Sequence, residues 1–137
     1  MSQVTLRFIK GSLLYLLTGI SMGLLMLLWP RWMGVYLPIH AHINLLGWVS
    51  MLMFGVSYHI LPRFSGKQLY SEMLASLHFW FANIGLIGLS FFWAQQRHRG
   101  GGSETLIILF ALIEAAACYM FVFNMWMTIF GKAKETA

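Results

Sequence analysis

The sequence predicts an all-α integral membrane protein, a four-helix bundle with both termini in the cytoplasm. Three observations predict it: a shortage of charge, four long apolar segments and the distribution of basic residues between the loops. Of the 137 residues, 59% are hydrophobic and only 9% are charged. A soluble domain carries about a quarter charged residues because its surface faces water. Lipid is therefore the expected partner of most of this surface.

Four segments are long enough to cross a bilayer, which takes about 20 apolar residues in a helix. They span residues 11–29, 40–61, 73–94 and 105–130, and we expect them to form one domain over residues 1–137. Pro30 closes the first segment, and Pro38 and Pro62 are expected to mark the ends of the second. Residues 100–102 predict a flexible turn, and Ser103 is the expected N-cap of the fourth helix.

The basic residues of the loops predict the orientation, because cytoplasmic loops are enriched in Lys and Arg. Six lie on the side of the termini and three on the other: Arg7, Lys10, Arg63, Lys67, Lys132 and Lys134 against Arg31, Arg97 and Arg99. The charges form no basic stripe, so we expect no nucleic acid partner despite the net charge of +5.

Histidines supply the candidate site. His40, His42, His59 and His78 fall in the spans or at their edges, where ionisable groups are costly and usually functional. The alternative for each is an interfacial histidine satisfied by its neighbours. With one cysteine and no carboxylate cluster in the sequence, ligation by imidazole favours heme iron or copper over structural zinc.

Depth separates these histidines. His40 and His42 are near the outer face, whereas His59 and His78 are in the inner third and could share one iron. His40 and His42 point to opposite faces, about 200° apart around the helix. His40 has a structural alternative, a hydrogen bond to Asn44 one turn away.

Glu114 is a single carboxyl group within the fourth span, roughly 13 Å deep at the rise of an α-helix. Such a group is paired, protonated or part of a proton path. We expect it to be paired or protonated, and a hydrogen bond to a ligating imidazole is a further hypothesis.

Residues 40–92 resemble the catalytic subunit of heme-copper oxidases and nitric oxide reductases. Residues 40–48 read HAHINLLGW, residues 58–63 read YHILPR, residues 77–80 read LHFW, and Ile84 and Gly85 follow. A late helix of that family begins His-x-His and runs to Tyr-x-x-x-Pro-Lys, and the next helix starts His-Phe-Trp. Residues 42–46 also resemble the early helix of the reductases, whose histidine holds low-spin heme b.

The resemblance implies that His42 is an axial ligand of heme b, that His40 matches the ligand of a second, high-spin heme, and that His78 matches a histidine that is not a ligand. It also implies a place in the bacterial inner (cytoplasmic) membrane. Helices matching the family's copper-binding histidines are missing, so we expect no complete oxygen or nitric oxide reductase activity from these residues alone.

The predicted function is therefore electron transfer, or binding of a diatomic gas such as nitric oxide, by heme b. We expect a homodimer in which both copies of His42 hold one heme; a five-coordinate iron on His42 is the alternative. Candidate partners are a quinol, a c-type cytochrome or an oxidase complex.

Two other functions stay open: a copper-handling or assembly protein that uses His40, His42 and His98, and a structural subunit without cofactors.

The predicted orientation can be tested with topology reporters. A reporter fused after Ala137 should be cytoplasmic, and one inserted at residues 100–102 should be periplasmic, because the Lys and Arg excess is on the side of the termini. Reporter activity outside the cell membrane for the C-terminal fusion would contradict this orientation and the depth assigned to each histidine.

Overall fold

The computed structural model is entirely helical over the residues that it describes, 1–100 and 102–131, apart from the short turns that join the helices. Four helical stretches are long and apolar enough to cross a membrane, which confirms the predicted fold class and number of spans. They are α1 (Gln3–Leu28), a second stretch that begins with η1 (Pro30–Trp32), then α4 (Glu72–Arg99) and α5 (Glu104–Phe130). The predicted loop charges Lys132 and Lys134 and the turn residue Gly101 lie outside the described residues.

The second stretch continues from η1 through α2 (Met33–His42), η2 (Ile43–Ser50) and α3 (Met51–Phe64) without a break. Pro38 lies inside α2 and Pro62 inside α3, so the prediction that these prolines mark the ends of the span was wrong. A proline removes one backbone hydrogen bond, but leaving the helix within a bilayer would expose many more unpaired backbone groups. The helix therefore continues through both prolines.

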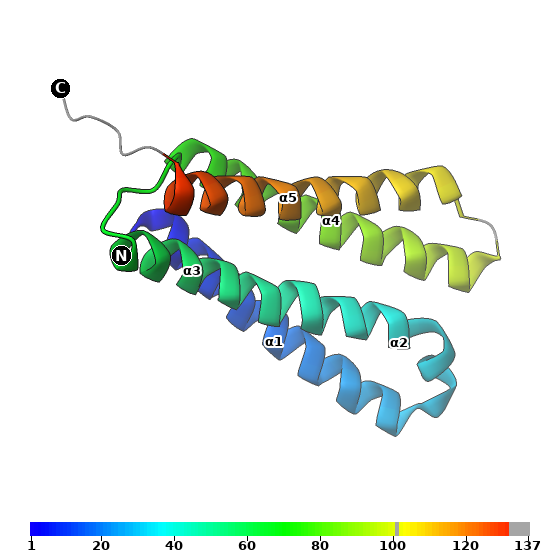
Figure 1. Ribbon diagram of the computed structural model, residues 1–137. Helices are drawn as coiled ribbons and strands as arrows, with labels where there is room; N and C mark the ends of the chain where they lie inside the picture. The colour runs from blue at the N-terminus through cyan, green and yellow to red at the C-terminus, as the bar shows by residue number, and fades with distance from the viewer. Residues whose placement is uncertain (101, 132–137) are drawn as a thin grey trace.

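The helices form two hairpins, one of α1 with α2, η2 and α3, and one of α4 with α5 (Figure 1). The hairpins are close together at the end that holds the N-terminus, residues 65–71 and the end of α5, and they diverge toward the two hairpin turns (Figure 1). We call these the termini end and the turn end. Gly100 ends α4 with φ +64°, and Ser103 caps α5 by accepting a hydrogen bond from the Leu106 backbone N–H at 3.4 Å, as predicted.

Residues 65–71 tie the hairpins together at the termini end. Asn124 of α5 is fully buried; its amide accepts a hydrogen bond from the Ser71 N–H at 3.1 Å and donates one to the Ser71 carbonyl at 2.9 Å. Lys67 Nζ donates to the carbonyls of Ile129 and Gly131, each at 2.8 Å. A cation is stabilising at the C-terminus of a helix, where carbonyls lack partners. The loop thus fixes the end of α5 against the start of α4.

Glycines bring α1 close to the second stretch, because each one receives a larger side chain from the facing helix. The facing pairs are Gly19 with Asn44, Gly23 with His40, Gly47 with Tyr15 and Gly55 with Phe8. Small residues are the usual way for membrane helices to approach closely, since lipid tails offer no hydrophobic drive for association. Gly19 and Gly23, one turn apart on α1, therefore serve a contact within the chain.

Between α2 and α3 the helix widens into a π-helix, η2, which begins directly after His42. π-helices are rare, usually a single turn, and are frequent at functional sites. Gly47 lies in η2, and a Cβ there would be 2.6 Å from Cγ of Tyr15. The sequence analysis did not predict a π-helix in this segment. It matters because the widened turn sets how the helix after His42 contacts α1.

Substituting Gly47 tests this packing. Gly47→Ala should lower the free energy of unfolding in detergent by about 1–3 kcal/mol, the usual cost of overpacking, because the new methyl meets the base of the Tyr15 ring. Gly34→Ala is the matched control, since Gly34 is helical and a Cβ added there would have no neighbouring atom within 4 Å. Equal effects of the two substitutions would contradict the proposed contact between η2 and α1.

Candidate functional site

His42 is the last residue of α2 and is held by the backbone of its own helix. Its Nδ1 is 2.8 Å from the carbonyl oxygen of Pro38. A carbonyl can only accept, so Nδ1 carries the proton and donates it, and Nε2 keeps its lone pair. The hydrogen bond of one ring nitrogen fixes the tautomer and the orientation of a ligating imidazole. His42 is therefore prepared to bind a metal through Nε2.

The ring of His42 faces the second hairpin. It meets Trp93 of α4 edge to face, with the ring centroids 5.3 Å apart, and it is partly buried. Leu45, close by in η2, is 62% exposed, so this side of the helix is open to lipid. The imidazole thus lies between an aromatic ring of α4 and a part of the helix surface that faces lipid.

His40 faces the opposite way, as its spacing from His42 predicted. Its Cε1 would be 3.3 Å from a Cβ on Gly23, so the ring lies against α1. Asn44 Nδ2 is 3.3 Å from His40 Nδ1 and donates to the His40 carbonyl at 2.8 Å, which confirms the expected interaction with Asn44. A porphyrin on His40 would require α1 to move away.

His78 is fully buried near the termini end. Its Nδ1 is 3.0 Å from the hydroxyl of Tyr58, and its Nε2 has no hydrogen-bond partner. The ring is surrounded by aromatic side chains with centroids 4.7 to 5.8 Å away, those of Phe54, Phe8, Phe121 and Tyr58. This packing joins α1, α3, α4 and α5 around the imidazole and leaves little room for a bulky ligand.

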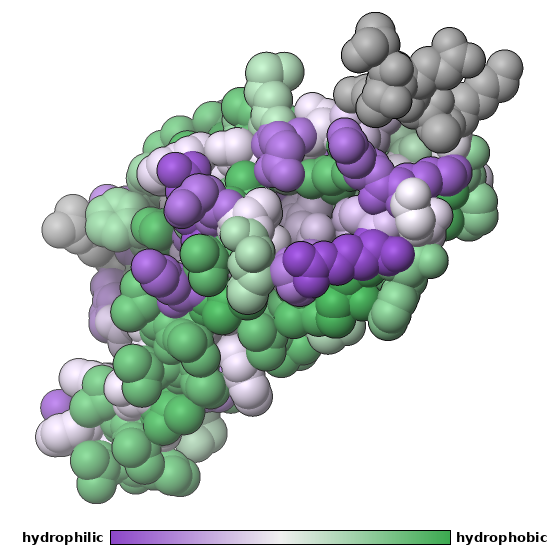
Figure 2. Space-filling model, turned by 90° about the vertical axis from the view of Figure 1, so that its left-hand side faces the viewer, coloured by the Kyte–Doolittle hydropathy of each residue, from purple (hydrophilic) through white to green (hydrophobic). Residues whose placement is uncertain are grey.

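His59 has a different partner. Arg63, which can only donate, places Nη1 at 2.7 Å from His59 Nε2. His59 and Arg63 line a polar pocket of about 310 Å³ at the termini end, together with Tyr58 and Glu72. Figure 2 looks onto this end and shows hydrophilic side chains gathered around a hollow. His59 thus contacts Arg63, whereas His78 contacts Tyr58.

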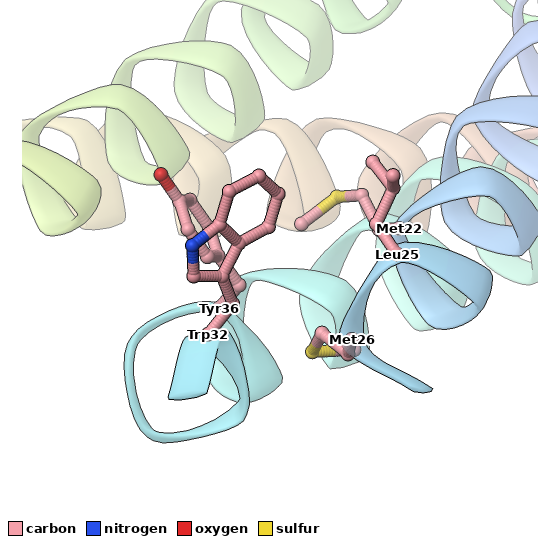
Figure 3. Close-up of a pocket in the computed structure, with 5 residues that line it drawn as sticks. All are labelled: Met22, Leu25, Met26, Trp32 and Tyr36. Atoms are coloured by element: carbon pink, nitrogen blue, oxygen red, sulfur yellow. The ribbon is translucent and has the colours of Figure 1, made fainter. Parts of the chain in front are cut away.

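His98 is part of a contact that the sequence did not predict. Its Nε2 hydrogen-bonds to the hydroxyl of Tyr36, which joins α4 to α2 at the turn end. Tyr36 also lines an apolar pocket of about 290 Å³ with Met22, Leu25, Met26 and Trp32. Figure 3 shows the Trp32 and Tyr36 rings side by side, with Met22 reaching toward them from α1. His98 thus hydrogen-bonds to Tyr36, whereas His40 packs against α1.

The copper hypothesis uses His40 and His42, with His98 as a further candidate ligand. Within residues 1–100 and 102–131, no group of three or more His, Cys, Asp or Glu side chains is placed to hold a metal ion. The three histidines instead contact three different neighbours, Gly23, Trp93 and Tyr36. The geometry thus favours a cofactor that needs one imidazole from this chain.

Glu114 lies in the interface of α4 and α5 and is 7% exposed. Its Oε2 has no hydrogen-bond partner, and a Cβ on Gly85 would be 2.7 Å from that oxygen. His42 meets α4 at Trp93 instead, about 12 Å from Gly85 along the helix axis. The structure therefore does not place Glu114 beside the His42 ring, and the hypothesis of a direct hydrogen bond between them was wrong.

Comparison with known proteins gives matches over the same region. Residues 17–96 match the profile of the family described as cytochrome c and quinol oxidase polypeptide I. Cytochrome c oxidase subunit 1 of Rhodobacter capsulatus is 47% identical over 49 residues, which are 35% of this chain and 9% of that protein. The Cbb3-type cytochrome c oxidase subunit CcoN1 of Stutzerimonas stutzeri is 43% identical over 49 residues, 35% of this chain and 10% of that protein.

A longer match includes more of the chain. The cytochrome c oxidase subunit 1 homolog (bacteroid) of Bradyrhizobium diazoefficiens is 30% identical over 115 residues, 66% of this chain and 21% of that protein. The chain thus spans less than a quarter of the length of these relatives. The family profile covers the C-terminal part of α1, the whole second stretch and most of α4, so the relationship extends beyond residues 40–92, on which the resemblance was first based.

Proposed function

The chain belongs to the family of cytochrome c and quinol oxidase polypeptide I, and from this membership we propose that it binds heme b through His42. The observation that supports the proposal most is the hydrogen bond from His42 Nδ1 to the Pro38 carbonyl, which leaves Nε2 as the ligand atom. A heme on this imidazole supplies one-electron transfer, or binding of a diatomic gas such as nitric oxide. Trp93 supports the His42 ring from α4.

The chain's own residues would set the properties of the bound iron. The Pro38 carbonyl makes the imidazole a stronger electron donor by holding its Nδ1 proton, and the apolar surroundings exclude water. The packing of His40 against Gly23 favours one heme-ligating histidine per chain over the two that the resemblance implies. We therefore assign His42 as the ligand and His40 as a packing residue of the interface between α1 and α2.

The second axial ligand is best supplied by another copy of the chain. Within the described residues, His78 and His59 lie toward the other end of the bundle and His98 is bonded to Tyr36, so none is available beside His42. A two-fold axis brings the same patch of each subunit together. Two copies of His42 could then hold one heme between them, with the exposed Leu45 and Val49 beside it in the dimer interface.

The proposed setting is the bacterial cytoplasmic membrane, crossed four times with both termini in the cytoplasm. A quinol, a c-type cytochrome or an oxidase complex would be the redox partner. Oxygen or nitric oxide reduction is not proposed for these residues alone, because the chain spans less than a quarter of the length of the relatives it matches.

Absorption spectra of the purified protein test the ligand assignment. The protein should show a Soret band, and His42→Ala should abolish it, since the ligating Nε2 is lost from both copies of the chain. His98→Ala is the matched control and should leave the band unchanged, because His98 contacts Tyr36. Bound copper without a Soret band would favour the copper-handling alternative. The absence of both copper and a Soret band would favour a structural subunit.

Heme stoichiometry tests the shared site. One six-coordinate heme per two chains is expected, and His42→Ala should lose the heme and the dimer together, because each chain contributes one imidazole. The measurement combines heme content per mole of protein with light scattering in detergent. A heme in every chain that survives dissociation to monomers would rule out the shared site and favour a five-coordinate iron on His42.

A further inference from the structure

The polar pocket of about 310 Å³ at the termini end has no part in the proposed heme site. It lies between two membrane-spanning stretches, where one ends at Phe64 and the next begins at Glu72. His59 of this pocket is roughly 25 Å beyond His42 along the same helix. A pocket of this size can hold one small ligand or the headgroup of a larger one.

Two opposite charges line this pocket. Arg63 is in the last turn of α3 and Glu72 is in the first turn of α4, and both side chains are exposed. Figure 2 shows the hydrophilic side chains around the hollow at this end. Within the described residues, Arg63 and Glu72 form no ion pair with each other. A ligand that neutralises both must therefore carry an anion and a cation a short distance apart.

The cationic side of the pocket is suited to a phosphate. Arg63 Nη1 donates to Nε2 of His59 at 2.7 Å, so His59 is neutral, carries its proton on Nδ1 and holds the guanidinium in place. A guanidinium presents further N–H donors in a fixed, planar arrangement that matches the oxygens of a phosphate. Gln68, from the loop of residues 65–71, adds its amide to the same pocket. This side thus provides several N–H donors for one anion.

The anionic side of the pocket is suited to a primary ammonium group. The carboxylate of Glu72 can only accept hydrogen bonds, and an ammonium group can only donate them. Tyr58, which also lines the pocket, is already hydrogen-bonded to the buried His78. A ligand with a phosphate alone would be repelled by Glu72, and a quaternary ammonium would have no N–H to donate to it. A phosphate linked to a primary ammonium satisfies both sides.

The apolar residues around these charges indicate that the ligand is a lipid. Pro62 and Leu69 line the pocket. Phe64 and Met73, each next in sequence to one of the two charged residues, are 85% and 73% exposed. Exposed apolar side chains at the end of a membrane-spanning helix suit acyl chains, and arginines at such ends extend to the level of the headgroups. Charges for a headgroup therefore lie beside apolar surface for its acyl chains.

We propose that this pocket binds the headgroup of phosphatidylethanolamine, with the phosphate on Arg63 and the ammonium on Glu72. The headgroup bridges the end of α3 and the start of α4, the two helices that residues 65–71 connect. Phosphatidylglycerol lacks the cation for Glu72, and phosphatidylcholine lacks the N–H donors, so both bind less tightly. The site needs no heme and does not rest on the proposed function.

Native mass spectrometry of the full chain in detergent, titrated with defined phospholipids, tests the site by counting the lipids bound per chain. The wild type should bind one phosphatidylethanolamine about fivefold more tightly than phosphatidylglycerol or phosphatidylcholine, the upper range for one exposed ion pair. Soluble phosphoethanolamine should bind more weakly than the lipid because it has no acyl chains. Equal affinity for the three lipids, or for phosphoethanolamine and the lipid, would overturn the proposal.

Two substitutions should change the lipid preference in different ways. Arg63→Gln should weaken the binding of both phosphatidylethanolamine and phosphatidylglycerol about fivefold, because both use the phosphate contact. Glu72→Gln should remove the preference for phosphatidylethanolamine, because the ammonium loses its partner and the phosphate is no longer repelled. Arg7→Gln is the matched control, since Arg7 is an exposed cation of α1 that does not line the pocket. Equal effects of Arg63→Gln and Arg7→Gln would overturn the proposal, because they would show a response to net charge alone.

Discussion

The close approach of helices at glycines is the constraint on which this bundle depends. Lipid does not drive helices together as water does, so packing and buried polar contacts must hold them. In the first hairpin, glycines of α1 receive Asn44 and His40, and a glycine of η2 receives Tyr15. In the second hairpin, Gly85 receives Glu114 and Gly88 receives Phe110. Most of these glycines accommodate a polar or ionisable side chain, so the same positions that pack the helices also place their functional groups.

This arrangement separates the two histidines of the His-x-His motif. His40 is covered by α1, whereas His42 is directed to α4 and bonded to the carbonyl of Pro38. Pro38 lacks an N–H, but its carbonyl accepts a hydrogen bond from Nδ1 of His42, one turn later on the same helix. The carbonyl of this proline thus orients the imidazole of His42. The widened helix η2 then begins at the next residue.

The sequence predicted those features that depend on composition and on contacts within one helix. Charge shortage and apolar length predicted the four spans, one-turn spacing predicted the interaction of His40 with Asn44, and the Ser103 cap was found as expected. Features that depend on pairs of helices were not predicted. The aromatic surroundings of His78 and the Tyr36–His98 bond join residues far apart in sequence, and nothing in a single sequence gives the rotation of one helix about another.

The prolines were misinterpreted for a related reason. Pro38 and Pro62 were expected to end the second span, by a rule that describes helices in water, where an unpaired backbone group can bond to solvent. In a bilayer the cost of unpaired backbone groups is larger, and the helix includes both residues. The family relationship, in contrast, was visible in residues 40–92, because a ligand motif with fixed spacing identifies a helix even when its neighbours are unknown.

The tautomer of His42 in the heme-free protein is the most direct test of the proposed ligand. Nitrogen-15 NMR of protein labelled at histidine, with the His42 signals assigned by their loss in His42→Gln, distinguishes a protonated from an unprotonated ring nitrogen. We expect a proton on Nδ1, which donates to the Pro38 carbonyl, an unprotonated Nε2, and a change in the Nε2 signal when heme is added. A proton on Nε2 with a bare Nδ1, or an Nε2 signal that heme does not alter, would contradict the assignment of His42 as the ligand.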